Sequence, residues 1–344
     1  MVRSLESKFI GCLFGGAIGD ALGMPLTGRT RAEIAGMGGV SDYLPAGDSA
    51  PVTLPLTALA DGEIEELLEA GQWTDDTQLS LALAETLIAE HGLFVPDAWA
   101  HGLVRWLNNV PRAPGLSSLE AAIQLRTGGA MWDEAADPEG GGCGAAARAA
   151  PIGLAYYADT AMRRRCAHLQ AMTTHGHPDA HAAAVAVAEA VAVTLPYGPE
   201  EVESWDGSAF LRNLRDVVTG CSPDFAEFGR CLDLALSLFE DDIDAETAVR
   251  VLGVSAWARE AVPAALYLVA RYPNDLERLL WSAVNLTGGA VESIATIVGA
   301  IGGALHGVTA LPGRWRRGVE DAPRLLETAL GMHRLTLPPS RFRE

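Results

Sequence analysis

The sequence predicts an all-α fold built as a single domain over residues 1–344. Apolar residues recur at the four-residue spacing of a buried helix face, as Leu79, Leu83 and Leu87 do. The alternating apolar and polar pattern that is typical of strands is nearly absent. No repeat, low-complexity linker or shift in composition marks a boundary, so we expect one domain.

The expected helices follow one another along most of the chain. The first, 9–23 (FIGCLFGGAIGDALG), consists of small and apolar residues that permit very close contact with another helix. The pattern predicts further helices over 77–90, 97–109, 117–126, 145–157, 178–195, 224–239, 259–271, 276–284, 293–306 and 322–333. The stretch 41–72 is rich in Pro, Gly and Asp, and we expect a long loop there with room for a short hairpin.

Composition narrows the class of protein. A formal net charge of -19 disfavours general binding to nucleic acid or to an anionic membrane, but leaves open a small anionic ligand in a local pocket. Five scattered cysteines without a CxxC pair indicate neither a disulfide framework nor a zinc knuckle. The N-terminus carries Glu6 and becomes glycine-rich too early for a signal peptide. We therefore expect a cytoplasmic protein without nucleic-acid or membrane partners.

The segment 73–77 (WTDDT) stands directly before a leucine-rich helix. A helix N-terminus favours a capping hydroxyl and acidic residues in its first turn, which is the simpler interpretation of Thr74, Asp75 and Asp76. The same residues form an oxygen-rich cluster that suits a hard cation such as Mg²⁺. Spacing alone favours capping over metal binding.

The segment 140–144 (GGGCG) leads into an alanine-rich helix. Its glycines would let the backbone approach a ligand, and amides at the helix start could hold phosphate, although a flexible loop explains the pattern equally well. Cys143 is interpreted as a structural or ligand-lining residue, because no partner base can be assigned to it.

The segment 173–179 (TTHGHPD) precedes another small-residue helix. His175 and His177 could bind a metal or a ligand, or could cap the helix that Pro178 opens. The absence of further Cys or His nearby argues against zinc.

The segment 288–293 (GGAVES) opens the last small-residue helix. Glu292 and Ser293 could add oxygen ligands to the first cluster if the two helix starts converge. Taken alone, they belong to an ordinary helix start.

Taken together and in this order, these segments resemble the ADP-ribosylglycohydrolase family over most of the chain. GGAIGDALG at 15–23 is similar to the family's opening helix, and WTDDTQ at 73–78 is similar to its TDDT metal motif. GCGAAARAAP at 142–151 is similar to its ligand-cradling loop. THGHP at 174–178 and the glycine-rich helix at 299–307 also fit the expected order.

The resemblance implies an orthogonal bundle of helices around a cleft that holds Mg²⁺ or Mn²⁺, two ions in the family. There the ions orient the ribose of an ADP-ribosyl group and activate water to cleave its bond to a protein side chain. The implied metal ligands are Thr74, Asp75, Asp76, Glu292 and Ser293, and the implied catalytic carboxylates are Asp75, Asp76 and Glu292. The implied ligand contacts are Gly142, Cys143, Gly144 and His175, whereas Asp20 is expected to fix the opening helix.

Two positions depart from the family's pattern. Its metal site ends in Asp-x-Asp-Ser/Thr, where this chain has Ala290, Val291, Glu292 and Ser293, so the first carboxylate is absent and the second is one methylene longer. Thr27 stands where many relatives carry a Glu. We therefore expect one ion or two, with the second bound weakly or not at all.

Three functions are consistent with the sequence. The first is a metal-dependent hydrolase of a ribosyl bond that removes ADP-ribose from a modified protein or small molecule. The second is a protein that binds ADP-ribose or a nucleotide with weak or no hydrolysis. The third is a family member that performs elimination or cyclisation in a biosynthetic pathway. The complete Thr74–Asp76 cluster and the complete glycine loop favour the first, whereas Ala290 and Thr27 favour the other two.

Overall fold

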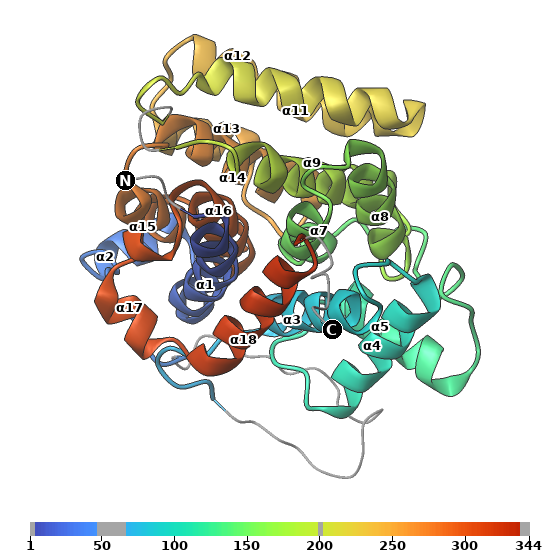
Figure 1. Cartoon of the computed structure of the whole chain (residues 1–344). Coiled ribbons are helices and arrows are strands. Elements are labelled where there is room, and N and C mark those ends of the chain that lie inside the picture. Colours follow the sequence, from blue (N-terminus) through green and yellow to red (C-terminus); the bar gives the residue numbers. More distant parts are fainter. Residues whose placement is uncertain (1–3, 47–66, 199–201, 338–344) are drawn as a thin grey trace, which may run out of the picture.

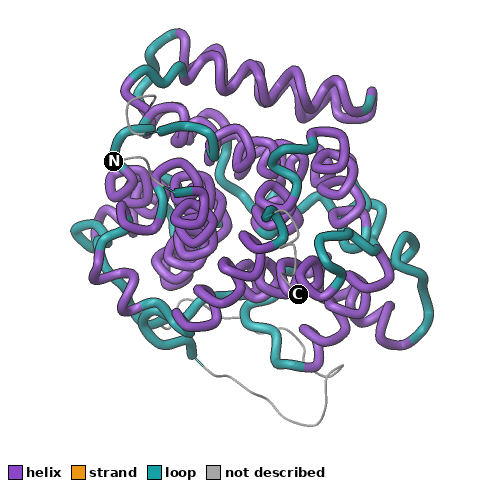
Figure 2. The backbone as a smooth tube through the Cα atoms, viewed as in Figure 1, coloured by secondary structure: helices purple, strands orange, loops and turns teal. Residues whose placement is uncertain are grey.

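The computed structural model describes residues 4–46, 67–198 and 202–337. These residues form helices joined by turns and loops, with no strand among them and two isolated β-bridges, Asp137 with His175 and Gly142 with Trp257. Figure 2 shows the helices in purple and the connecting loops in teal. The all-α prediction is confirmed.

The helices differ widely in length. In chain order they are α1 (Leu5–Gly23), α2 (Arg31–Gly36), α3 (Asp75–Ala89), α4 (Pro96–Asn108), α5 (Leu116–Thr127), α6 (Gly144–Ala147), α7 (Ala150–Ala155), α8 (Thr160–Met172), α9 (Pro178–Thr194), α11 (Gly207–Cys221), α12 (Ala226–Glu240), α13 (Ala245–Leu252), α14 (Ala258–Arg271), α15 (Leu276–Leu286), α16 (Val291–His306), α17 (Gly313–Gly318) and α18 (Ala322–Arg334). A short 3₁₀ turn, η1 (Met24–Leu26), follows α1.

Most expected helices are present, with ends that shift by a few residues. The segment 145–157 is not one helix but two, α6 and α7, because Pro151 near the start of α7 has no N–H to continue the helical hydrogen bonds. The sequence prediction missed α2, α8, α11, α13 and α17. Of these, α11 has its buried apolar residues at Phe210, Leu211, Leu214, Val217 and Val218, which is a helical pattern that the prediction overlooked.

The helices cross at steep angles. In Figure 1, α1 and α16 are viewed nearly end-on, whereas α11 and α12 lie along the plane of the picture on one side of the molecule. The small-residue helix α9 packs against α6, α7, α8 and α16 and is buried along almost its whole length. This arrangement agrees with the orthogonal bundle that the resemblance implies.

The central pair of helices, α1 and α16, is packed backbone to backbone. A Cβ added at Gly15 would lie 2.1 Å from the Gly299 carbonyl oxygen, and one at Gly19 would lie 2.0 Å from the Ala295 carbonyl oxygen. Going along α1, the contacting residues of α16 have decreasing residue numbers, so the two helices are antiparallel. The close contact expected of the first helix is therefore present, and it places the end of α1 beside the start of α16.

The segment Leu5–Leu26 is long and apolar enough, by length and composition, to cross a membrane. In the structure, 94% of its most apolar window is buried inside the protein, where α1 packs against α16 and α18. Its apolar character is accounted for by a position in the core.

The expected long loop at 41–72 is described at its two ends only, over 41–46 and 67–72. The Ala46 N–H donates to the Leu68 carbonyl oxygen at 2.8 Å, and the Tyr43 hydroxyl donates to the Trp315 carbonyl oxygen at 2.9 Å. The expected hairpin falls outside the described residues. The two ends of this stretch are thus bonded to each other just before α3 begins.

The glycine contact predicts that Gly15→Ala destabilises the fold, since the added methyl meets backbone that cannot move aside. We expect the free energy of unfolding to fall by at least about 1–3 kcal/mol, as measured by chemical denaturation. The matched control is Gly16→Ala, whose Cβ would lie 3.5 Å from the Ala300 Cβ in ordinary contact. The control should be neutral or stabilising by up to about 1 kcal/mol through helix propensity. Equal losses in both variants would contradict the close-packing argument.

Candidate functional site

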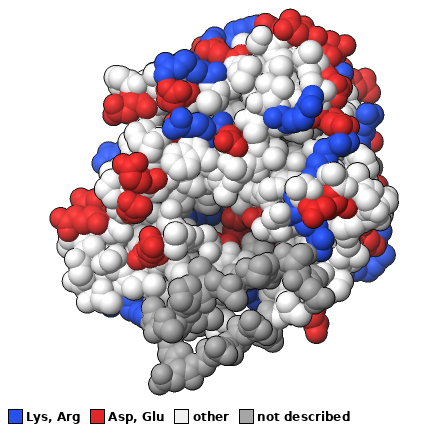
Figure 3. All heavy atoms as spheres, turned by 180° about the vertical axis from the view of Figure 1, so that it is seen from behind, with Lys and Arg blue, Asp and Glu red and all other residues white. Residues whose placement is uncertain are grey.

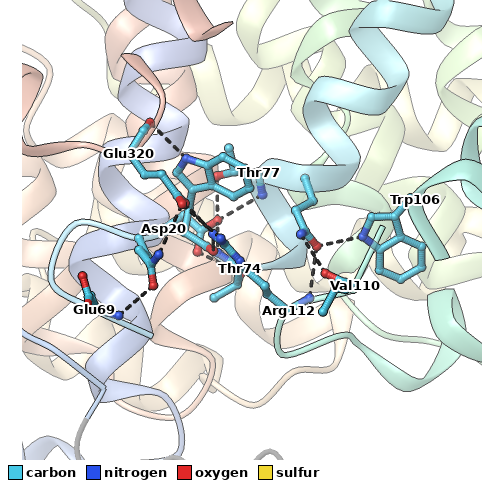
Figure 4. Close-up of polar contacts among 11 residues, drawn as sticks. Asp20, Glu69, Thr74, Thr77, Trp106, Val110, Arg112 and Glu320 are labelled. Atoms are coloured by element: carbon cyan, nitrogen blue, oxygen red, sulfur yellow. Dashed lines mark hydrogen bonds and ion pairs between the residues drawn. The ribbon is translucent and has the colours of Figure 1, made fainter. Parts of the chain in front are cut away.

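Asp20 joins the central helix to the start of α3. Its carboxylate is fully buried and accepts hydrogen bonds from the Thr74 N–H (3.1 Å) and hydroxyl (2.8 Å) and from the Thr77 N–H (3.0 Å) and hydroxyl (2.6 Å). Figure 4 shows this carboxylate between the two threonines. Asp20 thus holds α3 against α1, as expected for a residue that fixes the opening helix.

Thr74 caps α3. Its hydroxyl oxygen accepts from the Asp76 N–H at 3.3 Å while its proton goes to Asp20. The capping interpretation is therefore confirmed for Thr74, and only one lone pair of its oxygen remains for a metal ion.

The loop after α4 also holds the start of α3 in place through hydrogen bonds. The Gln78 side chain donates to the Val110 carbonyl oxygen at 3.2 Å and accepts from the Trp106 indole at 2.9 Å and the Arg112 N–H at 3.1 Å (Figure 4). The Arg112 carbonyl oxygen accepts from the Asp75 N–H at 2.8 Å. The first turn of α3 is thereby held from both sides.

Asp75 and Asp76 lie in this first turn with little exposure, 7% and 4%. Asp75 accepts from the Gly115 N–H at 3.0 Å, and Asp76 accepts from the Ser293 hydroxyl at 2.7 Å. Burial, with added repulsion from neighbouring carboxylates, raises the pKa of Asp75 to about 8 and that of Asp76 well above its ordinary value. The bond from Ser293 shows that the starts of α3 and α16 converge, which joins the first and fourth motifs into one site.

Glu292 lies in the first turn of α16 and accepts a hydrogen bond from the Thr27 hydroxyl just after η1. Burial raises the pKa of Glu292 to about 7, against the opposing effect of Thr27. Thr27 and Glu292, which both differ from the family's pattern, are therefore in direct contact through a hydrogen bond from a hydroxyl to a carboxylate.

Ala290 precedes α16 and is buried. Its N–H donates to the Val254 carbonyl oxygen at 2.9 Å, and its neighbour Gly289 exchanges backbone hydrogen bonds with residues 28 and 29. No side chain caps this helix at Ala290. The position at which the family's pattern has a carboxylate is thus filled by a methyl group on firmly held backbone.

The glycine loop packs against the segment that leads into α14. The Cys143 N–H donates to the Ala256 carbonyl oxygen at 2.8 Å, and the Ala258 N–H donates to the Gly141 carbonyl oxygen at 2.9 Å. A Cβ at Gly141 would lie 2.5 Å from the Trp257 ring, which explains the glycine there. The Cys143 amide is consequently occupied by protein and is not free to hold phosphate.

Cys143 itself is buried, with Asp76 and Ser293 as neighbours of its thiol. Burial raises its pKa, so the thiol stays protonated and is a poor nucleophile. Its position agrees with the interpretation of a structural or ligand-lining residue, and it shows that the glycine loop adjoins the carboxylates.

His175 lies on the other side of the glycine loop. Its Nε2 would be 3.5 Å from a Cβ at Gly142 and 3.8 Å from one at Gly144, so the ring lies directly beside both glycines. Burial and the charges of Arg148 and His181 hold the pKa of His175 well below its ordinary value, which keeps the imidazole neutral. His177 instead caps α9, accepting from the Asp179 N–H at 3.1 Å.

Arg148 lies close enough to the carboxylates to act on their charge, and the motifs alone did not indicate this. It is fully buried, its guanidinium lies 5.3 Å from the centre of the Trp99 ring, and its charge acts on both Asp75 and Asp76. Burial lowers its pKa to about 9, against the opposing effect of the two carboxylates. The sequence carries no signal for this position beyond its place in the alanine-rich segment.

The oxygen-rich donor set decides which cation could fit. Within the described parts of the chain, no group of three or more His, Cys, Asp or Glu side chains is placed to hold a metal ion by itself. Mg²⁺ commonly takes one or two protein carboxylates and keeps several waters. Carboxylates whose pKa values are raised by burial, with added repulsion between them, suit such a hydrated hard cation, whereas a zinc cage of Cys and His does not fit.

The face of the protein shown in Figure 3 carries mixed charge. On the face shown in Figure 3, Lys and Arg side chains are interspersed with Asp and Glu over the described residues. No broad basic area stands out among the residues drawn in colour. This distribution is in keeping with the net charge of -19.

Comparison with known proteins places the chain in a family. The sequence profile of the ADP-ribosylglycohydrolase family matches residues 1–340, so the chain belongs to that family. An uncharacterized protein of Archaeoglobus fulgidus is 36% identical over 339 residues, covering 96% of this chain and 97% of its own length. A solved structure described as an ADP-ribosylglycohydrolase-related protein complex superposes with a TM-score of 0.64 at 26% identity, covering 97% of this chain and 99% of its own.

More distant relatives have names that state an activity. The ADP-ribosylhydrolase ARH3 of Homo sapiens is 26% identical over 366 residues, which cover 97% of this chain and 94% of that protein. The ADP-ribosylarginine hydrolase Tri1 of Serratia proteamaculans is 26% identical over 319 residues, which cover 90% of this chain and 74% of that protein.

The raised pKa of Asp75 predicts how stability depends on pH in metal-free buffer. The folded protein holds this proton up to about pH 8, whereas the unfolded chain releases it near pH 4, so deprotonation opposes folding as pH rises through that window. Asp75→Asn keeps an acceptor for the Gly115 N–H and removes the charge. We expect the free energy of unfolding of the variant, relative to that of the natural protein, to increase by on the order of 2 kcal/mol from pH 5 to pH 8.

Denaturation at the two pH values measures this difference. The control is Glu85→Gln on the same helix, where Glu85 is an exposed partner of Arg324. A gain for Asp75→Asn that does not change with pH, or an equal change in the control, would contradict the argument.

Proposed function

We propose that this protein is a hydrolase of a ribosyl bond that releases ADP-ribose from a modified protein or small molecule, with Mg²⁺ or Mn²⁺ as cofactor. The observation that carries the proposal is the meeting of Asp75, Asp76 and Glu292 at the starts of α3 and α16, next to the glycine loop. The names of ARH3 and Tri1 support the same class of reaction.

The carboxylates define where a cation would sit. One or two of the carboxylates Asp75, Asp76 and Glu292 would bind it directly and its retained waters would contact the others, since no three of these side chains are placed to hold an ion by themselves. The Ser293 hydroxyl lies beside Asp76 as a further oxygen. A divalent cation supplies a Lewis acid that can bind a diol and activate a water molecule at neutral pH. Its charge would also offset the effect of burial and the added repulsion that raise the pKa values of the three acids.

The protein's own residues set the geometry around that position. Asp20, through its bonds to Thr74 and Thr77, fixes the backbone that presents Asp75 and Asp76. Gly142 and Gly144 lie beside the His175 ring and carry no side chain that would keep a ligand from it. A ribosyl group would lie between the carboxylates and the glycine loop.

A second function, ligand binding with weak or no hydrolysis, is favoured by one observation. Where the family's pattern has carboxylates at the positions of Thr27 and Ala290, this chain has a hydroxyl bonded to Glu292 and a methyl group. The site then has less negative charge for a second cation.

Hydrolysis is tested by incubating the protein with ADP-ribosylated peptide and Mg²⁺ or Mn²⁺ and measuring released ADP-ribose. We expect release that chelator abolishes, and at least about a 100-fold loss in Asp76→Asn, because an acid is removed from the reacting centre. Glu85→Gln, an exposed acid on the same helix, should retain full activity. Binding of ADP-ribose by calorimetry without turnover at high enzyme concentration would favour the binding function instead.

The variant Ala290→Asp tests the missing carboxylate. We expect it to raise both the number of Mn²⁺ ions bound, measured by calorimetry, and the hydrolysis rate, because it restores an oxygen ligand next to Glu292. An unchanged metal count would show that position 290 does not limit the site.

A further inference from the structure

Arg148 makes an unusually complete set of hydrogen bonds for a buried guanidinium. Its N–H groups donate to the Gln170 side-chain oxygen at 2.8 Å, the Gln170 carbonyl oxygen at 3.1 Å, the Ser118 hydroxyl at 3.2 Å and the Thr174 hydroxyl at 2.5 Å. The ring of Trp99 stacks under it. None of these partners is a carboxylate, so the bonds orient the guanidinium without neutralising it.

The bond to Thr174 decides where the threonine proton can go. Thr174 has no exposure, and its oxygen accepts a hydrogen bond from Arg148, which can only donate. Nδ1 of His175 lies 2.7 Å from the same oxygen and is its other side-chain partner among the described residues. If Nδ1 carried a proton, the threonine hydrogen would be left unpaired in the interior, at a cost of about 1–3 kcal/mol. The favoured arrangement has Thr174 donating to Nδ1.

A neutral imidazole that accepts at Nδ1 carries its proton on Nε2. This nitrogen lies beside Gly142 and Gly144, which carry no side chain to cover it, and it is not among the buried polar atoms without a partner. The rest of the residue is held as well, since the His175 carbonyl oxygen accepts from the His181 ring at 2.5 Å. The chain of bonds therefore ends in an N–H group directed at the glycine loop.

We propose that Arg148 is a positioning residue that acts through Thr174 to hold His175 in the Nε2–H tautomer, as a hydrogen-bond donor to an oxygen of the bound ligand. In this state Nε2 can neither accept a proton nor bind a cation, so His175 recognises ligand and takes no part in proton transfer. The class of ligand group is an acceptor oxygen, such as a phosphate or a ribose oxygen. The identity of the ligand rests on the proposed function, but the tautomer does not.

The tautomer is measured by ¹⁵N NMR of the protein labelled at histidine, in the absence of ligand, with Nδ1 and Nε2 assigned for His175. We expect the natural protein to show an unprotonated Nδ1 and a protonated Nε2. Thr174→Val, which has the same shape without the hydroxyl, should give a mixture of tautomers, and Thr174→Ser should restore the single one. Arg148→Lys should also give a mixture, because a lysine cannot make the same set of directed bonds.

The control for general loss of a buried arginine is Arg163→Lys. Arg163 is equally buried but pairs with Glu189 and with the carbonyl oxygens of residues 156 and 157, away from the glycine loop. This variant should leave the His175 tautomer unchanged. A shift in the control of the same size as in Thr174→Val would overturn the proposal, and so would a protonated Nδ1 in the natural protein.

Measuring the affinity for ADP-ribose distinguishes a failure of this inference from a failure of the proposed function. Calorimetry with ADP-ribose should show Kd about tenfold higher for Thr174→Val (about 1.4 kcal/mol) and near the natural value for Thr174→Ser. An unchanged Kd in Thr174→Val, despite mixed tautomers, would overturn the assigned role of the donor. If the natural protein shows the Nε2–H tautomer but does not bind ADP-ribose, the proposed function fails while the positioning by Arg148 stands.

Discussion

The backbone contact between α1 and α16 is the constraint on which the site depends. With glycine at residues 11, 15, 19 and 23, the two helices approach so closely that a Cβ at Gly23 would lie 2.6 Å from the Glu292 Cα. Helices separated by ordinary side chains lie about 8–10 Å apart. The close approach brings Asp20, near the end of α1, and Glu292, at the start of α16, to the same end of one pair of helices. The carboxylates lie close together because the backbones of α1 and α16 do.

Gathering acids in the interior has an energetic cost that the rest of the site offsets only in part. The hydrogen bonds from Thr74 and Thr77 stabilise the Asp20 carboxylate, and its pKa nevertheless rises to about 6 because burial outweighs them. Asp75 and Asp76 have fewer donors, and the charge of the buried Arg148 acts on both of them. A site in this condition favours a bound cation or a proton over uncompensated negative charge, so the proposed metal and the predicted loss of stability at alkaline pH have one physical origin.

Much of the fold could be read from the sequence because small residues and helical spacing are local signals. The helix starts at 73–77 and 288–293 were identified from local pattern, and so was the order of motifs that led to the family. The contacts between Thr27 and Glu292, and between Ser293 and Asp76, could not be derived, because they join residues that are 265 and 217 positions apart. Arg148 escaped notice because its role depends on the partners Gln170 and Thr174, which no spacing rule connects to it. The hydrogen bond from the Cys143 amide to Ala256 is a further nonlocal contact, and it removes one of the amides that the loop could have offered to a phosphate.

The short segment before α14 connects the two halves of the site. Its Val254 carbonyl oxygen binds the Ala290 N–H in front of the acids, and its Ala256 carbonyl oxygen binds the Cys143 N–H in the glycine loop. These two acceptors stand two residues apart on one short piece of backbone, which thus binds both the start of α16 and the glycine loop. An insertion or deletion of one residue at Ser255 would change the spacing between these two attachment points. Chain length at this point therefore helps to set how far the acids lie from the glycine loop.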